Sequence, residues 1–492
     1  MAELLELGAR ALSLEDVERV ARQGVSVGLA AASRARIAKG RDRLAERIAR
    51  GERIYGINTG VGGNQDFVVP PEDMERLQHN LMRHLSCATG APLPTDAVRA
   101  AMLLRVATFA TGTSAVRTEL VDALVAALNR GVTPVVPRYG SVGASGDLMP
   151  SAYIARLLVG MGEAELNSRR MSAAEALLSA HLEPVRFAPK EGLALINGTT
   201  VMTAVASLVW ADARRVLRTL LNTIALAVEA LQAPNQPFQP WVHEQKGHPG
   251  QIAVAAWIRE ALAGSQNVTA SSRQSGYSLR CAPQGLGPAW EALEDGRAVL
   301  EREINSANDN PLIDPESGTF YQAGNFYGGH IARLLDTWKL DFSVMASWAN
   351  ALMAVLVDPR FNAGLPANLT PEPGVNSGFK GMQLSVTSLA CAVRQMAGPS
   401  SIHSLPTEEY NEDVVSLGMH AAVTAMEALE CVRNETAMVL LAAAQAVDLR
   451  GGVARLGQGS RQIYEDVRKT AAFQDKDRPM EDEIAAVVRM ML

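Results

Sequence analysis

A glycine-rich stretch at 140–146, GSVGASG, places Ala144, Ser145 and Gly146 directly before a run with helical character. Glycine permits tight backbone turns that side chains forbid. In such a turn the amide nitrogen of Gly146 can attack the carbonyl carbon of Ala144. Loss of that carbonyl oxygen and of the Ser145 hydroxyl as water then leaves a ring with an exocyclic methylidene. The stretch therefore predicts a plain loop, a nucleophilic serine, or a carbon electrophile made from the backbone.

Standard catalytic motifs are incomplete. GASGD has Asp147 where the nucleophile elbow G-x-S-x-G requires its last glycine. His243 and His248 are spaced too widely for the zinc motif H-E-x-x-H. The glycine pairs in GVGG and GLG complete no dinucleotide fingerprint, and there is no phosphate loop. We therefore expect neither a metal nor a nucleotide cofactor.

Composition indicates a globular protein. The chain has 492 residues, of which 48% are hydrophobic and 20% charged, with a net charge of −6. This mild balance favours neither nucleic acid nor a membrane surface as a partner. The cysteines are far apart without a CxxC pair, which fits a reducing compartment. The N-terminal residues 1–20 have a helix-like pattern and lack the layout of a signal peptide, so we expect a cytoplasmic protein.

The elements that must position this stretch are helices. Apolar residues recur at helical spacing over 73–88, 96–111, 117–129, 200–232, 289–305, 329–357, 379–397 and 415–448. The polar or glycine-rich breaks between them contain nearly all the unusual residue clusters. The pattern predicts a mainly α protein: a smaller, loop-rich N-terminal lobe over 1–200 and a long-helix bundle over 201–492.

The glycine-rich stretch closely resembles the signature of the aromatic amino acid ammonia-lyases, which act on histidine, phenylalanine or tyrosine, and of related aminomutases. The resemblance continues in family order through most of the chain: IYGINTGVG (54–62), ALINGTT (194–200), YSLRCAPQ (277–284), NSANDNP (305–311), GNFYG (324–328), NSGF (376–379) and PSSIHSLPTEEYNEDVVSLG (399–418). It implies an ammonia-lyase/fumarase-like helical fold. It also implies that Ala144-Ser145-Gly146 cyclises autocatalytically to 4-methylideneimidazole-5-one (MIO), and that sites are shared between subunits of a homotetramer.

The resemblance also assigns roles around the ring. Tyr55 resembles the family's base, and a phenolate serves this purpose only if neighbouring donors or positive charge lower its pKa. Gly62 resembles the glycine that lets the tyrosine loop close. Asn197 resembles the asparagine that hydrogen-bonds the ring, and its position also fits a helix N-cap. Phe326 resembles an aromatic that packs against the ring, although a lone phenylalanine equally fits simple core filling.

A second group of residues surrounds YSLR. Arg280 resembles the arginine that pairs with the substrate carboxylate, for which a guanidinium is well shaped. Tyr277, three residues earlier, falls on the same side of a helix and resembles a tyrosine of the site. Gln274 matches a family glutamine and is assigned to substrate binding. Ser275 departs from the acid common in the family, and the segment 252–276 is shorter than the family's.

Two positions predict different substrates. His84 and Leu85 resemble the His-Leu pair of tyrosine lyases, where phenylalanine lyases have Phe-Leu and histidine lyases Ser-His. An imidazole can hydrogen-bond a para-hydroxyl group and so reject rings that lack it. Glu412, in contrast, resembles histidine lyases, since the other two classes usually have glutamine. With Leu85 in place of the second histidine, tyrosine or another para-polar phenylalanine is the preferred substrate.

The resemblance thus implies an enzyme that converts an aromatic L-amino acid, foremost L-tyrosine, to ammonia and the trans-arylacrylate, p-coumarate. Alternatives are a phenylalanine or histidine ammonia-lyase, or an aromatic 2,3-aminomutase that returns ammonia to the β-carbon. A helical scaffold that has lost activity is a remote alternative, because Tyr55, Ser145 and Arg280 are all present.

Overall fold

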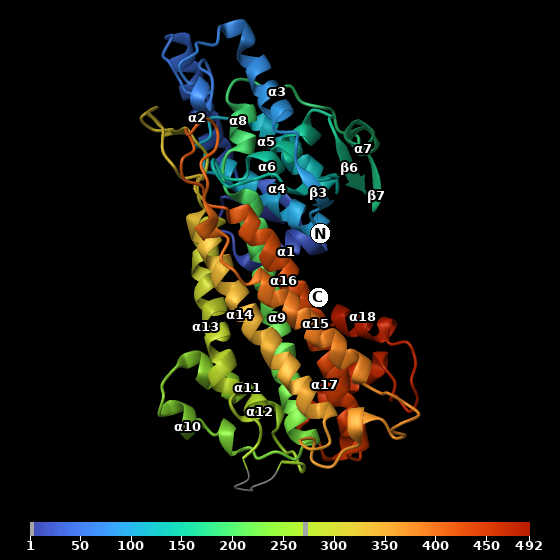
Figure 1. The fold of residues 1–492 in the computed structure, drawn as a ribbon. Coiled ribbons are helices and arrows are strands. Elements are labelled where there is room, and N and C mark those ends of the chain that lie inside the picture. The colour runs from blue at the N-terminus through green and yellow to red at the C-terminus, as the bar shows by residue number, and fades with distance from the viewer. Residues whose placement is uncertain (1–3, 269–273) are drawn as a thin grey trace. The chain divides into compact units, whose positions relative to one another are not determined.

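The computed structural model describes residues 4–268 and 274–492 and divides into two compact units (Figure 1). Unit 1 contains Met1–Leu208, Arg297–Leu335 and Pro399–Val423, and unit 2 contains Val209–Gly296, Asp336–Gly398 and Thr424–Leu492. Helices dominate both units, so the prediction of a mainly α protein is confirmed.

The units are discontinuous in sequence, whereas the sequence predicts two contiguous domains that meet at residue 200. The chain first leaves unit 1 at Leu208, close to that boundary. It returns twice, because later segments hydrogen-bond to unit 1. Asn305 Oδ1 accepts a hydrogen bond from the backbone N–H of Leu12 at 2.8 Å, and Asp309 forms a fully buried ion pair with Lys190 at 2.7 Å.

Unit 1 combines helices with short strands. Its helices are α1 (Leu14–Gln23), α2 (Ala31–Ala49), α3 (Met74–His84), α4 (Thr95–Ala110), α5 (Thr118–Asn129), α6 (Leu148–Leu158), α7 (Ala173–Ser179) and α8 (Glu191–Ile196). Its strands are β1 (Leu4–Leu7), β2 (Ser26–Leu29), β3 (Thr89–Pro92), β4 (Thr133–Pro134), β5 (Pro137–Tyr139), β6 (Glu163–Leu166), β7 (Arg169–Ser172), β8 (Leu312–Ile313) and β9 (Phe320–Tyr321). They form the sheets β1-β2, β3-β5, β4-β6-β7 and β8-β9. Helix α4 is the core helix of this unit, since its side chains are buried on nearly every side.

The helix-like pattern at the N-terminus is a strand in the structure. Leu4–Leu7 forms β1 and pairs in parallel with β2. Leu5 and Leu7 are buried while Leu4 and Glu6 are exposed, which is the two-residue alternation of a strand with one covered face. The helix expected there begins only at Leu14, where the Ser13 side chain and Asp16 form a capping box.

Unit 2 is a helix bundle. Residues of the long helices α9 (Thr200–Ala230), α13 (Ala282–Glu303), α14 (Gly329–Val357) and α16 (Gly418–Leu449) belong partly to each unit. Unit 2 also contains α10 (Pro240–Glu244), α11 (Pro249–Ala261), α12 (Tyr277–Arg280), α15 (Lys380–Met396), α17 (Gln458–Thr470) and α18 (Glu481–Arg489).

Specific contacts join the bundle helices of unit 2, which Figure 1 shows side by side. Trp210 on α9 donates to the carbonyl oxygen of Leu293 on α13 at 2.8 Å. Arg433 on α16 pairs with Asp212 on α9 at 2.7 Å. A Cβ at Gly285 would lie 2.0 Å from the Trp348 ring, so a glycine here lets α13 and α14 approach closely.

Helix α14 is apolar enough to cross a membrane by length and composition alone. A core helix of a soluble bundle meets the same criteria. Its Trp338 is fully buried and donates to the carbonyl oxygen of Ala292 at 3.1 Å. The contact ties α14 to α13, and the length of α14 matches the 329–357 segment predicted from the sequence.

Candidate active site

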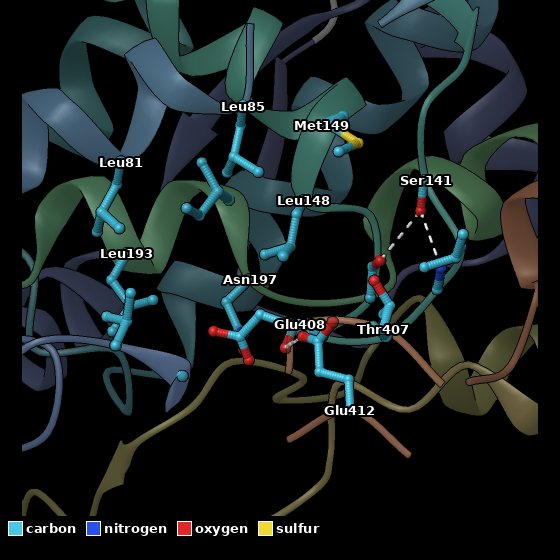
Figure 2. A pocket seen from close by; sticks show the side chains of 18 of the residues that line it. Leu81, Leu85, Ser141, Leu148, Met149, Leu193, Asn197, Thr407, Glu408 and Glu412 are labelled. Carbon is cyan, nitrogen blue, oxygen red and sulfur yellow. Dashed lines mark hydrogen bonds between the residues drawn. The ribbon is translucent and has the colours of Figure 1, made fainter. Parts of the chain in front are cut away.

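A pocket of about 310 Å³ lies in unit 1 (Figure 2). Its walls come from the loop after α2, the end of α3, the glycine-rich stretch, the end of α8 and the segment before α16. It brings together most of the predicted site residues: Tyr55, Gly62, His84, Leu85, Ala144, Ser145, Gly146, Asn197 and Glu412.

The glycine-rich stretch is a hydrogen-bonded turn. The Ser141 hydroxyl donates to the carbonyl oxygen of Gly146 at 3.2 Å and accepts from the N–H of Gly143 at 3.1 Å (Figure 2). Gly143 and Gly146 have φ values of +74° and +80°, a backbone region that side chains rarely adopt. The stretch is therefore a tight turn that its own hydrogen bonds stabilise.

A second anchor holds the turn from the side of α8. The N–H of Gly198 donates to the carbonyl oxygen of Ser145 at 3.2 Å, and the N–H of Asp147 donates to the carbonyl oxygen of Gly198 at 2.7 Å. A Cβ at Gly146 would lie 2.1 Å from that Gly198 oxygen. Position 146 therefore accepts only glycine without a shift of the backbone.

Asp147 anchors the turn to helix α9. Its Oδ2 accepts from the N–H of Met202 at 2.7 Å, in the first turn of α9, where carboxylates are favourable. Burial raises the pKa of Asp147 to about 7, although the backbone N–H groups of Met202 and Val201 oppose the shift. The aspartate that interrupts the nucleophile-elbow motif is thus a buried structural group.

Ser145 contacts Glu412 across the pocket. The Ser145 hydroxyl donates to Glu412 Oε1 at 3.0 Å. Burial raises the pKa of Glu412, and the hydrogen bond from Ser145 only partly offsets that rise. The reactive loop and the residue that separates histidine from tyrosine lyases in the resemblance are therefore in direct contact.

Glu408 is a pocket residue that the sequence reasoning missed. Its carboxylate accepts from the N–H of Gly63 at 3.0 Å and from the Asn411 side chain at 2.7 Å. A Cβ at Gly62 would lie 1.8 Å from Glu408 Oε1, so the glycine lets the tyrosine loop come close to this carboxylate. The signal was the acidic pair in TEEYNED, one turn before Glu412.

Tyr55 lies at the same pocket, and its hydroxyl oxygen accepts from the N–H of Gly62 at 2.8 Å. Burial raises the pKa of Tyr55 above its ordinary value. The Gly62 N–H opposes the rise, while the negative charges of Glu408 and Glu412 add to it. The lowered pKa that a base tyrosine needs is therefore not produced by the surroundings of Tyr55 within this chain.

His84 and Leu85 sit at the end of α3. His84 Nδ1 lies 3.1 Å from the carbonyl oxygen of Asn80. Because a carbonyl only accepts, Nδ1 is the donor in this contact, and in the tautomer with its proton on Nδ1 the other nitrogen, Nε2, is an acceptor. Leu85 is buried beside other leucines, and Figure 2 shows Leu81, Leu85 and Leu193 on one side of the pocket. The carboxylates of Glu408 and Glu412 lie on the other side.

Asn197 is buried at the pocket, where it ends α8 as its C-cap. The sequence reasoning allowed an N-cap role as well, but α9 begins only at Thr200. Within the described residues, Asn197 Oδ1 has no hydrogen-bond partner. A buried amide oxygen without a partner can accept a hydrogen bond from a ligand or prosthetic group in the pocket.

The remaining predicted residues do not line this pocket. Phe326 belongs to unit 1, half-buried before α14. Tyr277 and Arg280 belong to unit 2, where the guanidinium carbon of Arg280 lies 4.7 Å from the centre of the Tyr277 ring. Arg280 and Gln274 line a separate cavity of that unit, and part of the short 252–276 segment, 269–273, lies outside the described residues.

A metal site is not formed by the described side chains. Over residues 4–268 and 274–492, no three or more His, Cys, Asp or Glu residues are grouped so that they could hold a metal ion. His243, singled out by its spacing from His248, instead contacts the Pro237 carbonyl oxygen at 2.8 Å and the Gln251 amide at 2.9 Å. It is a structural histidine of α10.

Comparisons with known proteins show the family of the chain. A family model described as aromatic amino acid lyase matches residues 12–469. The chain is 41% identical to a histidine ammonia-lyase of Anaeromyxobacter sp. (strain K), over 99% of this chain and 98% of that protein. It superposes on the phenylalanine aminomutase of Pantoea agglomerans with a TM-score of 0.94, at 33% identity over 99% and 98% of the two chains.

A tyrosine aminomutase from Streptomyces globisporus gives the same TM-score of 0.94, at 33% identity, with 99% of this chain and 96% of that chain covered. The ammonia-lyase fold predicted from the resemblance is therefore confirmed. The family match extends over nearly the whole chain. The chain is a carbon–nitrogen lyase and belongs to the aromatic amino acid lyase family.

Proposed function

We propose that this protein eliminates ammonia from L-tyrosine and releases trans-p-coumarate. The observation that carries the proposal is the meeting of His84, Leu85 and the Ala144–Gly146 turn at one pocket. His84 Nε2 is an acceptor for a phenolic O–H, while Leu85 offers an apolar wall to the ring. His84 is exposed in this chain. Once a substrate ring covers Nε2, an acceptor without a donor costs free energy, so the proposed pocket favours a para-hydroxyl over an unsubstituted ring.

The electrophile of the proposed reaction is MIO, formed from Ala144, Ser145 and Gly146. The residues fit this group: the turn is already tight, Gly146 packs without a Cβ against Gly198, and the buried Asn197 Oδ1 is unpaired among the described residues. When formed, the group supplies a carbon electrophile that captures the substrate amine and makes it a better leaving group. Asn197 would hold it through its side chain.

Tyr55 is the proposed base that removes the β-proton of the substrate. Its raised pKa in this chain calls for a positive charge at the pocket, and the described lining residues include no lysine or arginine. Arg280, the proposed partner of the substrate carboxylate, belongs to unit 2. We assign Tyr277 and Gln274 to the same substrate-binding group and Phe326 to packing against the ring.

A homotetramer with shared sites would bring Arg280 of a partner subunit to the pocket. Apolar side chains on the unit 2 helices support association: Leu340 on α14 and Leu384 on α15 are 52% and 69% exposed. Exposed leucines at helical positions favour burial against another chain. The free cysteines favour a reducing compartment, and we place the protein in the cytoplasm.

Histidine is the second candidate substrate. Glu412, whose raised pKa reflects burial, can accept a hydrogen bond from an imidazole or hold the substrate ammonium. The relatives named histidine ammonia-lyase favour this alternative. The structural neighbours named aminomutases favour a further one, in which ammonia returns to the β-carbon. Phenylalanine is disfavoured, because it would leave His84 without a donor, and a scaffold without activity does not explain the intact turn.

One experiment separates these outcomes. The purified protein is incubated in turn with L-tyrosine, L-phenylalanine, L-histidine and 4-amino-L-phenylalanine, and the products are followed by ultraviolet spectra and chromatography. We expect p-coumarate and ammonia from tyrosine at the highest kcat/KM. The Ser145→Ala chain, which cannot form the methylidene, should lose turnover and the near-ultraviolet absorbance of the ring.

Each contrary outcome has a distinct meaning. Full activity of Ser145→Ala would overturn the mechanism. Urocanate from histidine as the main product would replace tyrosine as substrate, and a β-amino acid in place of the acrylate would identify a mutase.

A further inference from the structure

Arg105 is a buried cation that the proposed reaction does not use. It lies on α4 with a side chain that is 1% exposed. Burial lowers the pKa of Arg105 to about 10, partly offset by the charges of Asp309 and Asp147. The guanidinium is therefore still charged at neutral pH. A buried cation is costly unless its donors are satisfied, so its partners indicate what it does.

The hydrogen-bond partners of Arg105 lie in α8, in the turn after it and at the first residue of α9. Nη1 donates to the carbonyl oxygen of Asn197 at 2.7 Å and to that of Ala194 at 3.1 Å. Nη2 donates to the Thr200 hydroxyl oxygen at 3.0 Å. Bonds from a cation to carbonyl oxygens are stronger than neutral ones. Arg105 thus holds the Asn197–Gly198 peptide in place through its carbonyl oxygen.

That same peptide carries the donor that touches the reactive turn. Its carbonyl accepts from Arg105, while its N–H, on Gly198, donates to the carbonyl oxygen of Ser145 at 3.2 Å. Hydrogen bonds linked through one peptide polarise each other. The positive charge of Arg105 therefore makes the Gly198 N–H a better donor to Ser145.

The Ser145 carbonyl oxygen is the atom on which charge develops during the dehydration that makes the methylidene. Ring closure joins Gly146 N to Ala144 C, and the Ala144 oxygen leaves as water with the amide protons of Ser145 and Gly146. Dehydration then removes the Cα proton and the hydroxyl of Ser145 as a second water, and the Cα–H electron pair becomes the methylidene double bond. As that proton leaves, negative charge spreads onto the Ser145 carbonyl oxygen, where a fixed donor stabilises it.

We propose that Arg105 is a positioning residue for the maturation of the Ala144–Gly146 electrophile, acting through the Asn197–Gly198 peptide on the Ser145 carbonyl. The inference rests on the proposed function, since it assumes that this turn cyclises. A purely structural Arg105 would change the stability of unit 1 and leave the extent of maturation unchanged.

Helix α4 offers a matched control. Arg99 also donates to backbone carbonyls, those of Val20, Ala21 and Leu128, at 3.0–3.1 Å. None of these three contacts of Arg99 involves the turn between α8 and α9. Arg99→Gln should therefore lower stability without changing maturation. Thr200→Val, which removes one partner of Arg105 but keeps its bond to Asn197, should also mature.

The experiment measures maturation directly. Wild-type, Arg105→Gln, Arg105→Lys, Arg99→Gln and Thr200→Val chains are made in a cell-free system, and their intact masses are followed with time for the loss of two waters. Near-ultraviolet absorbance gives a second readout, and urea unfolding gives stability. We expect maturation of Arg105→Gln to be about tenfold slower than that of wild type, below the effect of removing a direct oxyanion donor. Arg105→Lys, which keeps the charge, should recover part of the rate.

Equal maturation rates for Arg105→Gln and Arg99→Gln would overturn the inference. If Arg105→Gln does not yield soluble protein, Arg105→Lys is compared with Arg99→Lys, and equal rates for that pair overturn it as well. A wild-type chain that retains both waters would instead contradict the proposed function itself.

Discussion

His84 is the residue whose hydrogen bond has the clearest chemical consequence. With its Nδ1 proton directed to the Asn80 carbonyl oxygen, its Nε2 can only accept while the ring is neutral. We therefore expect the pocket to bind best a substrate ring that carries a hydrogen-bond donor. Tyrosine and 4-aminophenylalanine provide one, and phenylalanine does not. Under the proposed function, we expect selectivity among aromatic substrates to depend on this one acceptor more than on ring size.

Replacing His84 tests this selectivity. His84→Phe should lower kcat/KM for tyrosine relative to that for phenylalanine by about tenfold or more, because the mutant pocket no longer offers an acceptor to the para-hydroxyl group. The measurement is the ratio of the two kcat/KM values. His79→Phe is the control, because His79 lies on the same helix but stacks on Phe187 with ring centres 5.2 Å apart. An unchanged ratio in His84→Phe would contradict the selectivity argument.

The sequence could predict residues that carry a motif, but not those that act through contacts. Tyr55, Ser145 and Glu412 stand in recognisable blocks, and all line the pocket. Arg105 does not stand out, because an arginine in an apolar helix usually lies at the surface. Glu408 stands in the same block as Glu412, but the block alone does not show which earlier loop its carboxylate contacts. Their partners are supplied by segments distant in sequence, so their roles became visible only in the fold.

At the scale of elements, helices of strong periodicity were predictable and short elements were not. The expected segment 200–232 corresponds to α9, Thr200–Ala230. Helix α11 was missed, because the predicted helical segments pass directly from 200–232 to 289–305. Proline at the first position of α10 and α11 was an available start signal. β1 was missed because a run of only four residues fits helical and strand patterns equally.

Helix α16 contains a buried carboxyl group with consequences for stability. Both oxygens of Glu435 are buried without a hydrogen-bond partner among the described residues. Burial raises the pKa of Glu435 from 4.5 to about 8, although the charge of Arg394 opposes the shift. Between these pH values the folded chain keeps a proton that the unfolded chain has released. The free energy of unfolding should therefore fall as pH rises from about 4.5 to 8.

Glu435→Gln should remove this part of the pH dependence. At pH 8 we expect the variant to be more stable than wild type by roughly 1–3 kcal/mol, and near pH 4.5 the difference should vanish. Urea unfolding at both pH values measures it. Glu430→Gln, at an exposed position of the same helix, is the control. If the free energy of unfolding of Glu435→Gln falls with rising pH as much as that of wild type, another group is responsible for the pH dependence.

At the scale of the whole molecule, the chain returns to unit 1 twice, and this was not predictable from a boundary near residue 200. Periodicity predicts elements but not which later loop hydrogen-bonds to which earlier one. The second return brings Glu408 and Glu412 to the turn at Ser145. The predicted site residues are nevertheless divided, because Tyr55 belongs to unit 1 and Arg280 to unit 2.

Mixed assemblies test whether sites are shared between subunits. Tyr55→Phe and Arg280→Met chains should each be nearly inactive, and their co-expression should restore activity, because some sites then combine an intact Tyr55 with an intact Arg280. Ammonia release by the co-purified mixture is the measurement. Tyr55→Phe with Ser145→Ala is the control, since both residues line one pocket of the same unit. Activity no greater than the sum of the separate chains would contradict sharing.

The contact between Gly146 and Gly198 has a consequence for the order of events during synthesis. Ser145 leaves the ribosome before Gly198, and well before Glu412, which contacts its hydroxyl. The nascent turn therefore lacks both the Gly198 N–H donor and the contact with Glu412 until the later segments have folded onto it. Under the proposed function, a methylidene made only at that stage would form inside the pocket. Cellular thiols and amines would react with an electrophile on an open loop. They reach this one only through the folded pocket.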